Sequence, residues 1–562
     1  MIRKHPVMSI SVITVATAII IISLIVFINF IRLSPIKDDV LRQDILRELD
    51  MMEYEDDETR PTRKELKQLT KLTHDFQKEG QQKATTLKGL QYATNLKELV
   101  INFNEIDNLK PLKDLTKLQK LNLSYADKEG HRFVEGPENR ITNIEPLENL
   151  TSLKELHLSN NAIEDLSPLQ HLKQLEKLYL SDNRIDNIEP VKKLPSLEEL
   201  DLEMNRIEDF SPLNDLTDLI TLNIQSNLDG ITDITFLKKL SNLRKLEVSR
   251  LGDIDYSPIG HLKNLQSLTL RDSELEQVSF LSELTNLKSL QILYNQISSL
   301  EGIENAEQLE MLNAPYNNIQ SVEPLKHLKE LKTLHLTDNE IQNIEPLADL
   351  AKLESVHLDQ NSISSIDPLL ELAQLKELFA SNNLLKDIDA AGDLKHLKAL
   401  FVDENSLTDI DSISNLYNLE TLVLSDNQIK TLEPLTDLTN LENIFLDQNR
   451  ISSIDPLKDL SQVKQLDVSY NLLKSIDAVE NMNNTVNLYA EDNLLSDIDS
   501  IADLTHLRHL NIRNNSIQDF KALESLNKLE DLFIEGNEVE DQKFLKELAE
   551  ENEDLSVDIL EK

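Results

Sequence analysis

The chain has 562 residues and a formal net charge of −43 at pH 7, and it contains neither cysteine nor tryptophan. The absence of cysteine excludes disulfide bonds, thiolate zinc sites and cysteine nucleophiles. The negative charge argues against a nucleic-acid partner, because binding a phosphate polymer requires basic side chains that displace its counterions. We interpret most of the acidity as keeping a long exposed surface soluble, and attraction of a cationic partner is the alternative.

The first predicted element is an apolar segment near the amino terminus. Residues 7–31 carry no charged side chain, and Arg3, Lys4 and Arg32 flank them. This length suffices to cross a bilayer, whereas the apolar part of a cleavable signal peptide is shorter and precedes small residues at the cut site. The pattern predicts a transmembrane signal anchor at residues 7–31 behind a short cytoplasmic tail at residues 1–6. A cleaved signal peptide is the alternative.

The predicted anchor sets the expected localisation. Basic residues on both sides of it leave its orientation open, but long acidic domains are translocated with little regard to loop charge. We therefore expect a single-pass protein of the cell membrane that contacts the bilayer through residues 7–31. The rest of the chain is expected to be extracytoplasmic.

A stalk is predicted between the anchor and the remainder, at residues 32–60. Apolar side chains recur there at helical spacing from Ile36 to Met52, and the acidic run from Glu53 to Glu58 ends the pattern. Two heptads are too few to establish a coiled coil. We therefore expect a monomer with a partly disordered stalk, and pairing of two chains is the alternative.

A helical cap is predicted next, at residues 61–86. Pro61 and the capping box of Thr62 and Glu65 are typical of a helix start. The apolar face of this predicted helix would contain Leu66, Leu69, Leu72 and Phe76. A stack of repeats needs such a cover, because an open end exposes leucines and a strand edge.

A repeat of 22 residues then fills residues 87–540. Leu197–Asp218 reads LEELDLEMNRIEDFSPLNDLTD, and Leu331–Lys352 reads LKTLHLTDNEIQNIEPLADLAK. Both follow L-x-x-L-x-L-x-x-N-x-I-x-x-I-x-P-L-x-x-L-x-x closely, and about 20 such units can be counted. This self-similarity is typical of a solenoid. Residues 541–562 are expected to form a C-terminal cap.

Each part of the repeat has a physical role. The alternating L-x-L segment predicts a short strand with its leucines inward and the intervening residues outward. The asparagine can bond backbone groups at the following turn, and stacking repeats it as a ladder. An acid before Pro-Leu predicts a short helical or 3₁₀ turn. We therefore expect an α/β fold, a curved solenoid with a parallel sheet on its concave face and short turns on its convex face.

The repeat resembles a known family. The unit with its N-x-I segment and Pro-Leu turn is similar to the leucine-rich repeats of bacterial internalins, which are surface proteins that bind other proteins. The resemblance covers about Leu87 to Val539, and Lys83–Leu99 is similar to that family's entry into the array. It implies a leucine-rich-repeat solenoid with a protein ligand. We find no LPxTG-type sorting motif, wall-binding module or immunoglobulin-like domain, so attachment through a sorting reaction is not expected.

A binding surface is predicted on the concave face. The residue between the two strand leucines is apolar or aromatic in six consecutive repeats, and acids lie two residues further along. Exposed aromatic side chains rimmed by acids are typical of protein-binding surfaces. The predicted partner-binding residues are His335, His357, Phe379, Phe401, Val423, Phe445, Tyr489, Asp359, Asp403, Asp447 and Glu491. The alternative is that ring stacking between strands only stiffens the sheet.

Two irregularities interrupt the array. Residues 126–138 are an insertion in the second repeat, which we expect to form a loop beside the strand edge. Leu251 and Ser273 replace the ladder asparagine in two later repeats, which predicts a local bend or weak point. Either feature could add binding specificity.

No constellation typical of an enzyme is present in the sequence. It contains no glycine-rich phosphate loop, G-x-S-x-G elbow or H-E-x-x-H pair. His335 and His357 lack a third metal ligand, and Asp497 and Asp499 lie outside any calcium-loop motif. We therefore expect neither catalysis nor a cofactor. The predicted function is cell-surface recognition or adhesion through a protein bound on the concave face, and a scaffolding or regulatory subunit of a membrane complex is the alternative.

Overall fold

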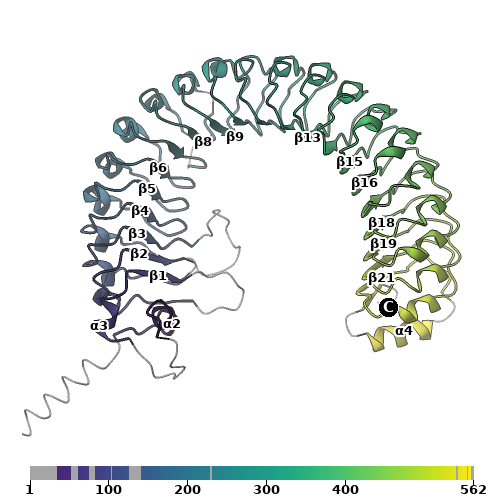
Figure 1. Ribbon diagram of the computed structural model, residues 1–562, viewed down its shortest axis with the longest axis horizontal. Coiled ribbons are helices and arrows are strands. Elements are labelled where there is room, and N and C mark those ends of the chain that lie inside the picture. The colour runs from purple at the N-terminus through teal and green to yellow at the C-terminus, as the bar shows by residue number, and fades with distance from the viewer. Residues whose placement is uncertain are drawn as a thin grey trace, which may run out of the picture. The chain divides into compact units, whose positions relative to one another are not determined.

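The computed structural model describes residues 35–51, 61–74, 83–102, 104–125, 141–227, 231–252, 254–539, 542–552 and 555–558. These residues form two compact units, which divide between Leu265 and Gln266. In each unit, short strands line the concave side and turns line the convex side (Figure 1). The division falls between Leu251 and Ser273, where the sequence departs from the ladder pattern.

The first unit contains a parallel sheet in which each strand pairs with the next along the chain. Its strands are β1 (Lys71–His74), β2 (Glu98–Ile101), β3 (Lys120–Asn122), β4 (Glu155–His157), β5 (Lys177–Tyr179), β6 (Glu199–Asp201), β7 (Thr221–Asn223) and β8 (Lys245–Ser249). Its 3₁₀ turns are Leu90–Tyr92, Lys110–Leu112, Glu145–Leu147, Ser167–His171, Glu189–Lys193, Ser211–Asp215, Thr235–Lys239 and Ile259–His261.

The second unit contains a longer parallel sheet of the same kind. Its first strands are β9 (Ser267–Arg271), β10 (Ser289–Gln291), β11 (Met311–Asn313), β12 (Thr333–His335), β13 (Ser355–His357), β14 (Glu377–Phe379) and β15 (Ala399–Phe401). The remaining strands are β16 (Thr421–Val423), β17 (Asn443–Phe445), β18 (Gln465–Asp467), β19 (Asn487–Tyr489), β20 (His509–Asn511), β21 (Asp531–Phe533) and β22 (Ser556–Val557). Its 3₁₀ turns are Ser279–Glu283, Glu323–Leu325, Glu345–Leu347, Asp367–Leu369, Asp389–Asp393, Asp411–Asn415, Glu433–Leu435, Asp455–Leu457, Asp477–Asn481, Asp499–Ile501 and Lys521–Ser525.

The leucines of the repeat form the core. Leu378 pairs in register with Leu400, and both side chains are fully buried. The same register recurs at each step, so equivalent apolar residues stack in columns along each unit. A repeat therefore buries its apolar side only against its neighbours, which is why the array is stable as a stack.

The predicted asparagine ladder is present, as Asn427 illustrates. Its Nδ2 donates to the carbonyl oxygens of Val402 (3.0 Å), Leu424 (3.1 Å) and Ser425 (3.2 Å). Its Oδ1 accepts from the Leu407 amide at 2.8 Å. The asparagine thus joins consecutive repeats and satisfies backbone groups at the turn that follows the strand.

The fold at the amino-terminal end differs from the predicted helical cap. The capping box of Thr62 and Glu65 is confirmed, but the helix α3 covers only Arg63–Leu66. The chain then enters β1, which pairs with β2 and supplies the edge strand. Leu69 and Leu72 are buried as predicted, although they lie in the connection and the strand. Phe76 lies outside the described residues.

The segment expected to be a partly disordered stalk contains the helix α2 (Asp39–Glu48). Its apolar side chains Ile36, Leu41 and Ile45 are buried, and Asp44 lies 2.7 Å from His74 in β1. The helical spacing in the sequence therefore reflects packing of α2 against the first strand. Residues 32–34 and 52–60 of this segment lie outside the described residues.

One part of the predicted fold class is wrong. It included an amino-terminal transmembrane helix, but no helix within the described ranges is long and apolar enough to cross a membrane. The two longest helices there, α2 and α4 (Gln542–Glu551), have 10 residues each. Such a helix spans about 15 Å, which is roughly half of the bilayer core. Residues 7–31, where the anchor was predicted, lie outside the described residues.

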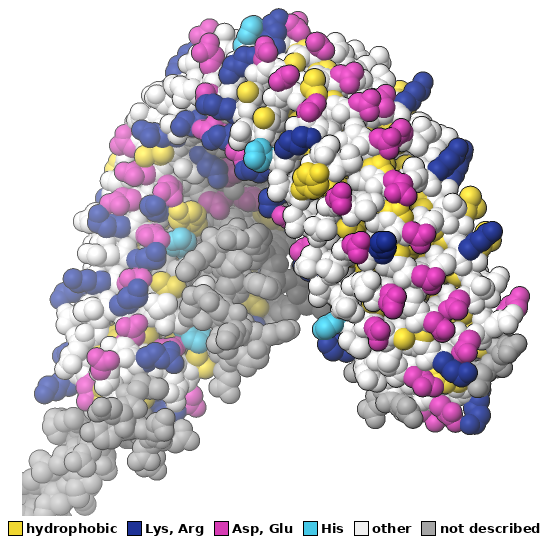
Figure 2. Space-filling model, turned by 45° about the vertical axis from the view of Figure 1, so that its right-hand side comes forward, with side chains coloured by type: hydrophobic (Ala, Val, Ile, Leu, Met, Phe, Trp, Pro, Cys, Tyr) yellow, Lys and Arg dark blue, Asp and Glu magenta, His cyan; other side chains and the backbone are white. Residues whose placement is uncertain are grey.

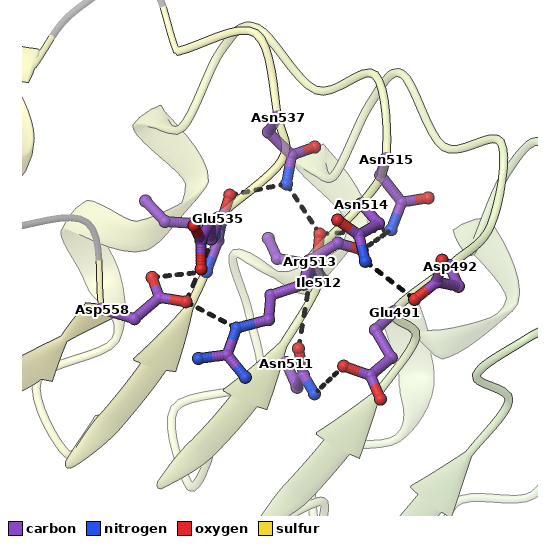
Figure 3. Close-up of polar contacts among 11 residues, drawn as sticks. Glu491, Asp492, Asn511, Ile512, Arg513, Asn514, Asn515, Glu535, Asn537 and Asp558 are labelled. Atoms are coloured by element: carbon purple, nitrogen blue, oxygen red, sulfur yellow. Dashed lines mark hydrogen bonds and ion pairs between the residues drawn. The ribbon is translucent and has the colours of Figure 1, made fainter.

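The end of the second unit is closed by α4 and β22, which pairs with β21. Asp558 accepts hydrogen bonds from Arg513 Nε (2.6 Å) and from the Glu535 amide (3.3 Å), as Figure 3 shows. It also accepts from the Ile534 amide (3.0 Å). These bonds satisfy backbone donors of the repeat that contains β21. The insertion at residues 126–138 lies outside the described residues.

Candidate functional site

The predicted aromatic residues lie side by side on the concave face of the second unit. His335, His357, Phe379 and Phe401 occupy the last position of four consecutive strands and pair in register. Ring centroids are 4.7 Å apart between the two histidines, 4.1 Å between His357 and Phe379, and 4.4 Å between Phe379 and Phe401. The stack that we considered as an alternative to binding is therefore present. A binding role stays a prediction.

The stack continues as a row of half-buried side chains. Val423 follows Phe401 and Phe445 follows Val423 in the register of the sheet, while Asp467 separates Phe445 from Tyr489. We call these residues the aromatic row: His335, His357, Phe379, Phe401, Val423, Phe445 and Tyr489. All of them are partly accessible to solvent.

The four predicted acids form a second row beside the first, two residues beyond each strand end. We call Asp359, Asp403, Asp447 and Glu491 the acid row. Thr337 Oγ1 donates to Asp359 at 3.2 Å, and the Glu491 carboxylate accepts from Asn511 Nδ2 at 2.6 Å (Figure 3). These bonds hold the carboxylates in place on the exposed side of the sheet.

Hydroxyl groups orient the central acids in the same way, which the sequence analysis missed. Ser381 Oγ donates to Asp403, and Ser425 Oγ donates to Asp447. The signal was available, because serine or threonine occupies the acid-row position in the intervening repeats. This pattern alone does not predict the bonds, because serine and threonine are common on exposed strands without bonding to a carboxylate.

Asp467 is a further acid on this face that was not included among the predicted site residues. It lies at the aromatic-row position, and burial, together with the nearby Asp447 and Glu491 carboxylates, raises its pKa to about 6. The amide of Ser469 donates to it at 3.0 Å. The amide and the side chain of Ser469 both lower the pKa of Asp467, but burial outweighs them, so this carboxylate is poorly compensated.

We expect the substitution Asp467→Asn to stabilise the protein at pH 7. The folded-state pKa of about 6 exceeds the ordinary value of 3.8, so the folded protein binds the proton more tightly and stability falls as pH rises from about 4 to about 6. Two pKa units correspond to at most about 3 kcal/mol. Urea unfolding at pH 4 and pH 7 measures the effect. An equal loss of stability with pH in both proteins would contradict the assignment.

Burial disfavours the charged form of the two histidines of the row. Burial lowers the pKa of His335, and the neighbouring His357 lowers it further. Burial also lowers the pKa of His357, although Asp359 and Glu377 oppose the shift. Both rings therefore act as neutral aromatic surfaces. No group of three or more potential metal ligands occurs among the residues that the structure places.

The concave face of the first unit has a different charge pattern. Lysine and glutamate alternate along the first strand position, and Lys120 lies 2.7 Å from Glu155 and Lys177 2.5 Å from Glu199. A hollow of about 640 Å³ lies on this face, and Asp201 is among its lining residues. Burial raises the pKa of Asp201 to about 6. The lysines and glutamates of the first strand position thus neutralise one another, whereas Asp201 has no such partner among the described residues.

Acidic side chains are spread over the face shown in Figure 2, with lysine and arginine side chains between them. Ion pairs between neighbouring repeats, such as Lys376 with Glu354 at 2.6 Å, occur just before the strands of the second unit. Acids without an ion pair in the described part of the chain also occur on the turn side, as at Glu371, Asp437 and Asp459, so the concave strip differs from it by its aromatic side chains and by its lack of Lys and Arg.

Comparisons with known proteins agree with this architecture. A family model described as "Leucine Rich repeats (2 copies)" matches residues 137–171, 173–215, 307–352, 329–371 and 395–437. No curated protein matches the chain. The chain carries leucine-rich repeats, and the matching model describes a repeat and not a catalytic domain.

Several solved structures are similar. A plant peptide hormone receptor, RGFR1, solved in complex with RGF2, is 21% identical with a TM-score of 0.61, and the match covers 83% of this chain and 81% of the receptor. A leucine-rich-repeat protein of Leptospira interrogans is 23% identical with a TM-score of 0.57, over 75% of this chain and 99% of that protein. An internalin of Listeria monocytogenes is 27% identical with a TM-score of 0.37, and the match covers 78% of this chain and 98% of the internalin.

Proposed function

We propose that the second unit binds a peptide or protein segment on its concave face. The observation that carries the proposal is the pair of rows, in which half-buried rings lie beside carboxylates and no Lys or Arg occupies an outward position of β12–β19. The rings offer apolar area at low cost in conformational entropy, and the acids offer charge complementarity. The similar receptors RGFR1 and HAESA were solved in complex with RGF2 and with an IDA peptide hormone ligand, respectively.

The experiment removes the rings while keeping the sheet. We expect the triple variant Phe379→Ser, Phe401→Ser, Phe445→Ser to lose capture of its partner by cross-linking on intact cells. Loss of one aromatic anchor weakens binding by about 2 kcal/mol, or roughly 30-fold. Circular dichroism and thermal unfolding establish that the variant still folds.

A matched control removes apolar side chains of the same unit away from the aromatic row. Leu370, Leu384 and Tyr417 are exposed to 41, 57 and 53%, and their replacement by serine should leave capture unchanged. Unchanged capture by the aromatic variant would contradict binding and favour a scaffolding role.

We further propose that recognition takes place at the cell surface and that the protein acts as a monomer. The resemblance of the repeat to internalin repeats supports the location. Protease treatment of intact cells tests it, because an extracytoplasmic array is cleaved and an internal one is protected. Analytical ultracentrifugation of the purified chain tests the monomer.

A further inference from the structure

The acid row of the second unit has a regular spacing. Its members Asp359, Asp403 and Asp447 occur in every second repeat, and Ser381 and Ser425 occupy the repeats between them. Neighbouring parallel strands lie roughly 4.8 Å apart, so consecutive acids are about 9.6 Å apart. Hydroxyl groups of the preceding repeat orient all three carboxylates, which makes the spacing a fixed feature of the face.

No basic side chain compensates these acids on the face itself. In β12–β19, the outward positions are the first and last strand residues and the residue two positions further on, and none of them is Lys or Arg. Six of them are carboxylates: Asp359, Glu377, Asp403, Asp447, Asp467 and Glu491. Burial raises the pKa of Asp403, and Asp359 and Asp447 add to the shift. The strip therefore favours a cationic occupant.

One shared metal ion does not fit as that occupant, because no group of three or more potential metal ligands occurs among the described residues. Oxygen ligands of calcium lie about 2.3–2.6 Å from the ion, so two coordinating oxygens are at most about 5 Å apart. Acids about 9.6 Å apart instead fit several separate cations carried on one molecule.

The same distance discriminates between peptide conformations. A polyproline II segment has three residues per turn and a rise of about 3.1 Å, so every third side chain lies on one side at intervals of about 9.3 Å. An α-helix returns to one side after seven residues, or about 10.5 Å. The four acids of the row span three intervals. Over that length, the spacing of the peptide side chains differs from the spacing of the acids by about 1 Å for polyproline II and by about 3 Å for the helix. A β-strand presents one side every two residues, at about 6.6 Å, which does not match.

We propose that this face binds a basic, proline-rich segment in the polyproline II conformation, running along the two rows and across the strands. Lys or Arg at every third position pairs with Asp359, Asp403, Asp447 and Glu491. Proline rings lie against the aromatic row, as in other aromatic-lined grooves that recognise this conformation. The inference rests on the proposed function and specifies its ligand.

Two labelled peptides of identical composition test the inference against the full chain by fluorescence anisotropy. One is Lys-Pro-Pro repeated four times, and the other has its four lysines together at one end of eight prolines. We expect the repeated peptide to bind at least about tenfold more tightly, which corresponds to about 1.4 kcal/mol. The triple variant Asp359→Asn, Asp403→Asn, Asp447→Asn should lose at least about tenfold of that affinity. Asparagine can still accept the hydroxyl bonds, so the fold is kept.

A matched variant removes three charges from the turn side of the same unit. The exposed residues Glu371, Asp437 and Asp459 are replaced by Gln, Asn and Asn, and affinity for the repeated peptide should change by less than about twofold. Equal affinity for the two peptides, an undiminished affinity in the acid-row variant, or no binding of either peptide each overturns the inference. Tighter binding of a helical peptide with lysines seven residues apart also overturns it. The serine variant of the aromatic row tests the proposed function separately, because its readout is the captured partner.

Discussion

Replacement of Asn427 by alanine is expected to destabilise the second unit by about 2–4 kcal/mol. The substitution leaves the carbonyl oxygens of Val402, Leu424 and Ser425 without this donor and the Leu407 amide without an acceptor. Asn427 is 7% exposed, so water cannot replace these bonds without rearrangement. Urea unfolding measures the loss of stability, and hydrogen exchange at the Leu407 amide localises it.

Asn440 provides the control in an adjoining turn. Its Nδ2 also donates to a backbone oxygen, that of Tyr417 at 2.7 Å, but the bond is exposed to solvent. Asn440→Ala should cost less than about 1 kcal/mol, because water can take over the bond. Equal destabilisation by the two substitutions would show that the ladder contributes no more than an ordinary surface hydrogen bond.

The substitution Gly302→Pro is expected to destabilise the second unit by at least about 3 kcal/mol, although it restores the repeat pattern. Residue 302 aligns with Pro324 of the next repeat, but its φ is 112° and a Cβ built there would lie 2.6 Å from Ser279 Cα. Proline fixes φ near −65° and removes the amide that donates to Glu304 at 2.7 Å. The unfolding midpoint in urea measures the effect.

At residue 478, we expect the introduction of the proline of the repeat pattern to have the opposite effect on stability. Ala478 aligns with Pro456 and lies in the 3₁₀ turn Asp477–Asn481, where a negative φ suits proline. Ala478→Pro should therefore be neutral or stabilise by up to about 1 kcal/mol, through a less flexible unfolded chain. If both substitutions change the free energy of unfolding in the same direction, the backbone conformation at residue 302 does not determine the outcome.

The different charge pairing on the two concave faces explains why binding is proposed for the second unit and not for the first. In the first unit, alternating lysine and glutamate pair with each other, as Lys120 does with Glu155. Such pairs must break before an external ion can replace them. In the second unit, Asp403 accepts from the Ser381 hydroxyl, and Asp447 accepts from the Ser425 hydroxyl and from Gln448 Nε2 at 3.5 Å, all of them neutral donors. A cationic ligand therefore adds an interaction there without displacing one.

The arrangement of the proposed binding face could largely be predicted, because it depends on two periods that are visible in the sequence. The 22-residue repeat sets which strands are neighbours, and the alternation within L-x-L sets which side chains point outward. Phe379 and Phe401 were therefore placed on adjacent strands from the sequence, and the register of β14 and β15 agrees. Their ring stacking follows from that register.

The terminal regions were predicted less well, because the repeat does not extend into them. The helical spacing of Leu41 and Ile45 could be recognised in the sequence, but the surface that buries their side chains could not. That surface is β1, where His74 meets Asp44. An apolar stripe on a short segment is equally compatible with a pairing stalk and with packing on its own domain, and only the spatial neighbour distinguishes the two.

The sequence by itself determined the repeat, its inward leucines, its ladder asparagines and the order of residues along each row, because these depend on periods that are local in the chain. Only the tertiary structure decided the hydroxyl bonds to the acid row, the raised pKa of Asp467, the left-handed backbone at Gly302 and the packing of α2 on β1. These features arise from contacts between residues that are distant in sequence and from the removal of water around them. The repeat places a serine or threonine beside each acid of the row, but no period in the chain records the bond itself or the removal of water.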